Sequence, residues 1–169
     1  MVIEDLALER FGNRVPQFTF EVCRPAQPGS PGHELDPPYA MRGVAILPGS
    51  GEYTLAMQPV EMNYGPGSGR LINVNSPSGK ADFATSLDEL QGELPACRTA
   101  SLIVSWFGDD LRCGACTIRP KVEQHQFDAR GMRWMAGGAT RTTAQRVALD
   151  GAGRPVYGGT PADAAVIQA

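Results

Sequence analysis

Two pairs of residues lie close enough together in the sequence to share chemistry: the carboxylates Asp109 and Asp110, and the thiols Cys113 and Cys116. A pair of carboxylates could supply the general acid and base of a glycoside hydrolase. Adjacent residues of an extended chain point to opposite sides, however, so both carboxylates cannot face one bond. The competing interpretation is a solvated turn in which an Asp accepts hydrogen bonds from nearby amides. Asp109 and Asp110 are therefore candidate catalytic residues, with this alternative open.

The CxxC pair of Cys113 and Cys116 could be half of a zinc site or a redox-active dithiol. A structural zinc site needs four ligands, and the sequence contains neither a second CxxC nor an HxxxH motif. Residues 117–120 do not begin a helix, as a thioredoxin-like motif would require. We therefore expect no metal and no cofactor, and we favour a loop-stapling or free pair of thiols. Cys97, Cys113 and Cys116 are kept as the alternative metal ligands.

The elements that position these residues are expected to be short, because the 169 residues include 20 glycines and 14 prolines. This composition argues against a helical bundle and favours short strands joined by turns. Residues 17–22 alternate in polarity like an antiparallel strand, and residues 24–40 predict a linker or long exposed loop. Extended runs are expected at residues 43–47, 52–58 and 71–74, with hairpin connections at residues 49–51 and 65–69.

The pattern changes near residue 80, where helical spacing begins. Ser86 and Glu89 match a capping box, and the leucines that follow recur at helical spacing until Pro95. Residues 100–107 are almost wholly apolar, which predicts a strand buried on both faces. A helix followed by a buried strand differs from the alternating pattern upstream, so the sequence predicts a domain boundary near residue 80.

The C-terminal residues predict the beginning of a helix. Thr160 is the expected N-cap, Pro161 the first helical residue, and Asp163 lies in the first turn. The sequence stops roughly two and a half turns later without a capping glycine. From this pattern we expect a truncated element.

Charge and hydropathy exclude several classes of protein. The net charge of −3 provides no basic surface for a phosphate backbone, so nucleic-acid binding is disfavoured. No apolar run approaches the ~20 residues of a membrane span, and the acidic N-terminus lacks the features of a signal peptide. Four cysteines are too few for a disulfide scaffold, which favours synthesis in a reducing cytoplasm.

Several longer segments resemble a known family of proteins. Residues 5–22, with the string FGNRVPQFTFEV, resemble a stretch of large phage tail-tip and baseplate proteins. Residues 73–79, 86–90 and 105–114, the last reading SWFGDDLRCG, resemble the beginning of a TIM-barrel-like domain. That domain belongs to the multidomain baseplate protein of gene transfer agents, which are phage-derived particles that package host DNA. Residues 157–164 also resemble its early part.

The resemblance implies a mixed fold with two parts. Residues 1–80 would form a β-rich, phage-tail-like segment that includes the Pro/Gly-rich loop at residues 24–40. Residues 81–169 would form the first βα elements of a TIM-barrel-like α/β domain. A TIM barrel takes about 250 residues, so this domain would be incomplete and the chain would be an internal fragment of a longer protein.

The implied function is structural: a component of the baseplate or tail tip of a gene transfer agent or prophage, involved in host-surface attachment. The implied partners are other tail and baseplate proteins, with a host cell-surface glycan as a further candidate. The implied location is the bacterial cytoplasm during assembly and the tail of the particle, or virion, afterwards. A glycoside-hydrolase-like barrel in a longer relative would not by itself establish an activity, and we do not expect this fragment to be an enzyme.

Two alternatives remain open. One is a glycoside-hydrolase-like enzyme that acts on cell-envelope glycans and uses Asp109 or Asp110. The other is a small cysteine-metal module built on Cys97, Cys113 and Cys116.

Overall fold

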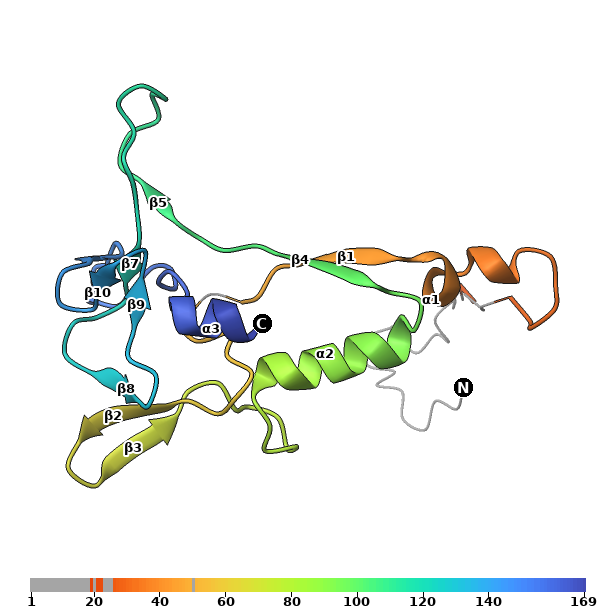
Figure 1. Ribbon diagram of the computed structural model, residues 1–169, viewed down its shortest axis with the longest axis horizontal. Helices are drawn as coiled ribbons and strands as arrows, with labels where there is room; N and C mark the ends of the chain where they lie inside the picture. Colours follow the sequence, from red (N-terminus) through yellow and green to blue (C-terminus); the bar gives the residue numbers. More distant parts are fainter. Residues whose placement is uncertain (1–18, 20, 23–25, 50) are drawn as a thin grey trace, which may run out of the picture. The chain divides into compact units, whose positions relative to one another are not determined.

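The computed structural model describes residues 19, 21–22, 26–49 and 51–169, and its backbone is of mixed type (Figure 1). Helices account for 17% of the residues and strands for 23%, so the expected mixed composition of small sheets and few helices is confirmed. The chain divides into two compact units, residues 1–36 and 37–169. Of the strand predicted over residues 17–22, residues 17, 18 and 20 lie outside the described residues, and residues 19, 21 and 22 belong to no strand.

The described part of the first unit is a loop with one short 3₁₀-helix, η2 (His33–Leu35). The Asp36 carboxylate accepts a hydrogen bond of 2.8 Å from the Ala26 amide, which closes this loop. In the second unit, α1 (Pro37–Ala40) adds one helical turn. The exposed loop predicted over residues 24–40 is thus confirmed where it is described, with two helical turns at its end.

Small sheets make up the second unit. Strand β1 (Gly43–Ile46) pairs in parallel with β4 (Thr99–Leu102). Strand β2 (Glu61–Gly65) lies between β3 (Ser68–Leu71) and β8 (Asp128–Arg130) in an antiparallel sheet. The remaining pairs are two residues long: β5 (Phe107–Gly108) with β6 (Ile118–Arg119), β7 (Lys121–Val122) with β11 (Gln145–Arg146), and β9 (Met135–Ala136) with β10 (Ala139–Thr140).

Two of these sheets join strands from before and after residue 80. The pairs β1–β4 and β2–β8 both do so, and the parallel pair needs a long connection between its strands. That connection contains the β2–β3 hairpin and the helix α2 (Asp82–Glu93). The two segments distinguished in the sequence therefore share sheets, and the domain boundary at residue 80 stays a prediction.

The predicted hairpin at residues 65–69 is present, whereas the one at residues 49–51 is not. Gly65 and Gly67 have φ values of 132° and 71°, a region that glycine adopts readily, and they turn the chain between β2 and β3. Strand β1, which precedes residues 49–51, pairs with β4 rather than with the next strand of the sequence. A hairpin connection at residues 49–51 was therefore the wrong prediction.

The extended run expected at residues 52–58 is wrong, since these residues form turns. The cause is the side chain of Asn73, which is buried beside them. Its amide nitrogen donates to the carbonyls of Ala56 (3.4 Å) and Gln58 (3.0 Å), and its oxygen accepts from the Val60 amide (2.7 Å). One side chain thus satisfies backbone groups that a neighbouring strand would otherwise pair. Of residues 71–74, only Leu71 belongs to a strand.

The strand predicted over residues 100–107 is also not buried on both faces. Strand β4 ends at Leu102, and beyond it Ile103 and Trp106 are 45% and 43% exposed. Burial of a parallel strand requires a neighbour on each edge and helices over both faces. Within the described residues β4 has one neighbour, β1, so its apolar side chains lack the surfaces that would cover them.

Helix α2 begins four residues before the predicted capping box. Its N-cap is Ala81, and Ser86 lies inside the helix. The first turn is fixed by Asp82, whose two carboxylate oxygens accept hydrogen bonds of 2.7 Å from the backbone and side-chain nitrogens of Asn75. The helix ends at Glu93, just before Pro95, as predicted.

The predicted C-terminal helix is present as α3 (Asp163–Gln168), but its N-cap is Ala162 rather than Thr160. Thr160 is fully buried, and its hydroxyl accepts a hydrogen bond of 3.1 Å from the Lys121 amide. That hydroxyl is therefore engaged with β7 instead of the helix. None of the helices in the described ranges has both the length and the apolar character that crossing a membrane requires.

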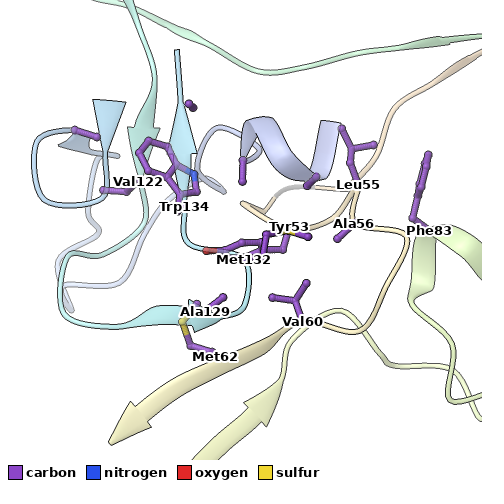
Figure 2. Packing of buried hydrophobic residues seen from close by; sticks show 14 residues of the cluster. Tyr53, Leu55, Ala56, Val60, Met62, Phe83, Val122, Ala129, Met132 and Trp134 are labelled. Carbon is purple, nitrogen blue, oxygen red and sulfur yellow. The ribbon is translucent and has the colours of Figure 1, made fainter. Parts of the chain in front are cut away.

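The core of the second unit surrounds Trp134, which is 1% exposed and therefore a packing residue. Figure 2 shows the cluster, with Tyr53 and Met132 near its middle. The indole Nε1 of Trp134 donates to the Thr160 carbonyl at 2.8 Å. The core is rich in small side chains: it contains Ala56, Ala129, Ala136, Ala144, Ala162 and Ala165 besides Tyr53, Leu55, Val60, Met62, Phe83, Val122, Met132 and Trp134.

Trp106 lies over the turn between β9 and β10, and we expect a Cβ at Gly137 to disturb this contact. A Cβ there would be 2.4 Å from Cη2 of Trp106, whereas a Cβ at Gly138 would meet no atom within 4 Å. Both glycines have positive φ, so the backbone strain of alanine is common to both. Gly137→Ala should lower the free energy of unfolding by about 1–3 kcal/mol more than Gly138→Ala, measured by urea titration.

The variants Trp106→Ala and Trp106→Ala/Gly137→Ala provide the control: in the absence of the indole ring, adding Gly137→Ala should cost only about as much as Gly138→Ala does in the wild type. Equal losses in Gly137→Ala and Gly138→Ala would contradict the packing of Trp106 on this turn.

Candidate functional site

The most tightly connected polar cluster of the described residues consists of Glu52, Tyr53, Asp128 and Arg141. The side chains of Arg141 and Glu52 are each 4% exposed, so the ion pair between them is buried. Both terminal nitrogens of Arg141 contact the carboxylate of Glu52, with Nη1 donating to Oε1 at 3.1 Å and Nη2 donating to Oε2. This two-bond geometry is the strongest arrangement available to an arginine and a carboxylate.

The rest of the guanidinium is also surrounded by partners. Nη1 donates to the Gln124 carbonyl at 3.0 Å, and Nη2 donates to the Tyr53 hydroxyl oxygen at 3.2 Å. Nε forms an ion pair with Oδ1 of Asp128 at 3.1 Å. The guanidinium carbon lies 5.9 Å from the centre of the Trp134 ring, a cation–π distance. Nε has no hydrogen-bond partner in the described part of the chain, so its interaction with Asp128 is one of charge alone, whereas both terminal nitrogens are hydrogen-bonded.

Asp128 connects this cluster to the backbone of β8 and the segment that follows. Its Oδ1 accepts hydrogen bonds from the Tyr53 hydroxyl (3.0 Å) and from the amides of Ala129 (2.9 Å) and Trp134 (3.0 Å). Glu52 likewise connects the cluster to the backbone, because its Oε1 accepts a hydrogen bond of 2.8 Å from the Glu123 amide. The cluster therefore joins segments that are far apart in the sequence.

The environment shifts the pKa of each member. Burial raises the pKa of Glu52, although its hydrogen bonds and charge interaction with Arg141 oppose this effect. Burial also raises the pKa of Tyr53. For Arg141, desolvation acts to lower the pKa, but the hydrogen bonds and charge of Glu52 outweigh it and the pKa is raised. For Asp128, desolvation acts to raise the pKa, but the hydrogen bonds from the amides of Trp134 and Ala129 outweigh this effect, and the pKa is lowered.

A cavity of about 620 Å³ lies beside the cluster and shares Glu52 and Tyr53 with it. The rings of Tyr64 and Phe127 meet edge to face in its wall, with their centres 5.0 Å apart. Its amide side chains are already committed, since Gln124 bonds both backbone groups of Phe127. The described lining residues include no Cys, His or Lys, so the cavity offers aromatic surface and carboxylates rather than an activated nucleophile.

Asp109 and Asp110 lie elsewhere, in the connection between β5 and β6. Oδ1 of Asp109 accepts a hydrogen bond of 2.7 Å from the Thr117 amide. Asp110 accepts from the backbone nitrogen of Arg112 (2.8 Å) and from its Nε (3.0 Å) and Nη2 (2.7 Å). The side-chain hydrogen bond from Arg112 lowers the pKa of Asp110. The contacts of both carboxylates stabilise a turn, and a catalytic role for Asp109 or Asp110 stays a prediction.

The structure does not bring the cysteines together as a metal site. Cys113 and Cys116 lie in the same connection as the two aspartates, whereas Cys97 precedes β4 and its thiol donates to the Thr99 carbonyl at 3.5 Å. All three are free thiols. In the part of the chain that the structure describes, no three or more His, Cys, Asp or Glu side chains are placed to hold a metal ion. Cys23 lies outside the described residues.

No protein-family model matches the chain, and no curated protein matches it in sequence.

We expect the buried ion pair to dominate the stability of this region. Replacement of Arg141 by Met would keep much of the side-chain volume but leave the Glu52 carboxylate buried without its partner. Arg141→Met should therefore lower the free energy of unfolding by about 3–5 kcal/mol in urea titrations at pH 7. Arg154→Met is the matched control, because Arg154 is 78% exposed and its pair with Asp150 should contribute at most about 1 kcal/mol. Similar losses in both variants would contradict this assignment.

The lowered pKa of Asp128 predicts an acid-dependent loss of stability. Because its pKa is lower in the folded state than in the unfolded state, ionised Asp128 stabilises the fold above the ordinary Asp pKa. This contribution is lost as the pH falls through the folded-state pKa. Asp128→Asn should therefore show a shallower decrease in unfolding free energy between about pH 5 and pH 2 than the wild type.

The exposed Asp88, paired with Lys80 at 2.7 Å, provides the matched control for this titration. Asp88→Asn should leave the slope nearly unchanged. An Asp128→Asn slope equal to that of the wild type would show that Asp128 does not stabilise the fold through its charge.

Proposed function

We propose that the chain is a structural component of a phage-like tail baseplate or tail tip, of the kind that gene transfer agents and prophages carry. Its role would be to join other tail proteins and to take part in attachment to the host surface. The proposal rests on the resemblance of residues 5–22 and 105–114 to such proteins, and on one structural observation. That observation is the uncovered apolar surface of residues 102–118, which overlap the second of these segments.

This surface, which we call the 102–118 surface, exposes one large apolar side chain after another. The exposed fraction is 45% for Ile103, 43% for Trp106, 105% for Leu111 and 65% for Ile118. An apolar recess of about 280 Å³ lies at its beginning and is lined by Ile103, Trp106, Phe107, Tyr157 and Pro161, among others. A concentration of exposed apolar side chains along one segment, next to an apolar recess, favours a protein–protein contact. These exposed apolar side chains support a role in assembly with other proteins rather than as a free monomer.

We propose further that residues 81–169 begin a TIM-barrel-like domain, to which β1, the partner of β4 from before residue 80, would then contribute a strand. In such a barrel every strand is parallel to its neighbours and is paired on both edges. Strand β4 is parallel to β1 and has one edge without a partner among the described residues. This is the edge at which a further parallel strand of the longer protein would be added.

The contacts of Asp109 and Asp110 favour the structural proposal over a hydrolytic one. Each carboxylate is engaged with the backbone of its own turn, through Thr117 and Arg112. Hydrolysis of a glycosidic bond would need two carboxylates facing the same bond across a substrate. These contacts favour a role of both residues in the shape of the connection between β5 and β6.

The proposal is tested on purified particles from a strain that produces them. Mass spectrometry of particles separated on a density gradient should find peptides of this chain in a fixed ratio to known tail proteins. The variant Leu111→Ser/Ile118→Ser should be depleted from the particles several-fold, whereas Ile167→Ser, at an 84% exposed position on α3, should assemble normally. Detection of the chain only in the soluble cell fraction would overturn the proposal.

The same surface should bind a hydrophobic dye when the chain is isolated. The triple variant Ile103→Ser/Leu111→Ser/Ile118→Ser should reduce the fluorescence of bound anilinonaphthalene sulfonate by about half or more, because it removes three of the four large exposed apolar side chains of this surface. The triple variant Met57→Ser/Leu71→Ser/Ile167→Ser, at exposed positions elsewhere, is the matched control. Equal reductions in the two variants would show that the dye does not report on the 102–118 surface.

A further inference from the structure

The connection between β5 and β6, residues 109–117, contains two thiols on a single turn. The hairpin is closed by only two residue pairs, Phe107 with Arg119 and Gly108 with Ile118. Figure 1 shows residues 109–117 as a loop beyond β5. Cys113 and Cys116 both belong to this loop and are both free. The dithiol therefore lies at the end of the hairpin, where the two short strands constrain the chain least.

The backbone of the loop places the two cysteines at bridging distance. The Arg112 carbonyl accepts hydrogen bonds of 2.9 Å from the amides of both Ala115 and Cys116, which is the pattern of one helical turn. In a helical turn, Cα atoms three residues apart are separated by about 5 Å. This separation lies inside the range of disulfides, about 4.4–6.8 Å, so a bridge needs rotation of side chains but little movement of the backbone.

The turn is held in this shape without a disulfide. The Asp110 carboxylate accepts three hydrogen bonds from Arg112, and Asp109 fixes the Thr117 amide on the other side of the turn. These contacts fix the residues that flank the pair. They reduce the conformational entropy that ring closure would otherwise cost, because the dithiol form already has the backbone of the bridged form.

The two thiols differ in access. Cys113 is exposed, whereas Cys116 is half-buried with its Sγ over the backbone of Gly108. A Cβ at position 108 would lie only 2.8 Å from that sulfur, so the glycine provides the space that the thiol occupies. An external reagent therefore meets Cys113 first, and Cys116 lies next to it as the second thiol.

We propose that Cys113 and Cys116 form a reversible dithiol–disulfide pair, in which Cys113 reacts first and Cys116 closes the bridge. The oxidant is a low-molecular-weight disulfide of the glutathione class. The Cys113 thiolate attacks one sulfur of the oxidant, which forms a mixed disulfide and releases one thiolate. The Cys116 thiolate then attacks Sγ of Cys113, which forms the protein disulfide and releases the second thiolate. Two electrons pass from the protein to the oxidant, and the two thiol protons pass to the released thiolates.

The pair is tested by equilibrating the full-length chain in mixtures of reduced and oxidised glutathione, followed by an acid quench, alkylation and peptide mass spectrometry. For an intramolecular bridge, the ratio of disulfide to dithiol follows oxidised glutathione divided by the square of reduced glutathione. Doubling total glutathione at a fixed ratio of its two forms should therefore about halve the disulfide-to-dithiol ratio. A mixed disulfide would not respond to this change.

Single variants identify the order of the two steps. Cys116→Ser should accumulate a stable glutathione adduct on Cys113, and Cys113→Ser should form its adduct on Cys116 several-fold more slowly, because that sulfur is less accessible. A wild-type chain that accumulates mixed disulfide, that bridges Cys113 to Cys97 or Cys23, or that forms dimers through Cys113 would overturn the proposal. So would a pair that stays reduced in every mixture.

The contribution of the preformed turn has its own control. Asp109→Ala should lower the equilibrium constant for bridge formation by about two- to tenfold, which corresponds to the loss of one ordinary hydrogen bond that orders the turn. Asp150 holds the backbone nitrogen and Nε of Arg154 in a similar turn away from the thiols. Asp150→Ala should leave the equilibrium constant unchanged, and an equal effect of both variants would contradict the role assigned to the turn.

Discussion

The fold of the second unit depends on one buried cation, the guanidinium of Arg141. Removing such a group from water is costly, and a single carboxylate would compensate it only in part. Here Glu52 approaches it from one segment and the Gln124 carbonyl and Asp128 from another, so the charge is compensated only when all of them are in place. Pairs of two-residue strands are not stable by themselves. The cluster supplies the long-range contacts that such small sheets and an alanine-rich core do not.

The parts of the fold that were predicted correctly are those that local chemistry determines. Pro95 ends α2, the glycines of residues 65–69 turn a hairpin, and a C-terminal helix forms, although it begins two residues later than predicted. The capping prediction failed at Ser86 because Asp82 binds Asn75 and fixes the first turn earlier. Likewise, the prediction that residues 100–107 form a buried strand failed. Their apolar character indicates a preference for burial, but it does not indicate whether another part of the protein covers them.

The buried cluster could not be predicted, because its members are far apart in the sequence. Glu52 and Arg141 are separated by 89 residues, and Arg141 stands between threonines, a context equally typical of an exposed arginine. The hydrogen-bonded turn at the candidate carboxylates was easier to predict, because an Asp followed two residues later by an Arg suits such a turn. In the proposed assembly this turn would also affect the contact surface. Its thiols lie between Leu111 and Ile118, so a change in their redox state would alter the stiffness of the 102–118 surface.

Asn73 has a consequence for how this protein can change over evolutionary time or be engineered. Its side chain and the hydrogen bond from the Ile72 amide to the Val60 carbonyl close the base of the β2–β3 hairpin. The path of residues 56–60 is thereby set from the base, while the tip at Gly67 contacts nothing that a side chain would disturb. Only the tip of the hairpin is free of the core, because Met62 of β2 is buried and β2 also pairs with β8. An inserted peptide or label at this tip would extend outward and leave the path of the buried turns unchanged.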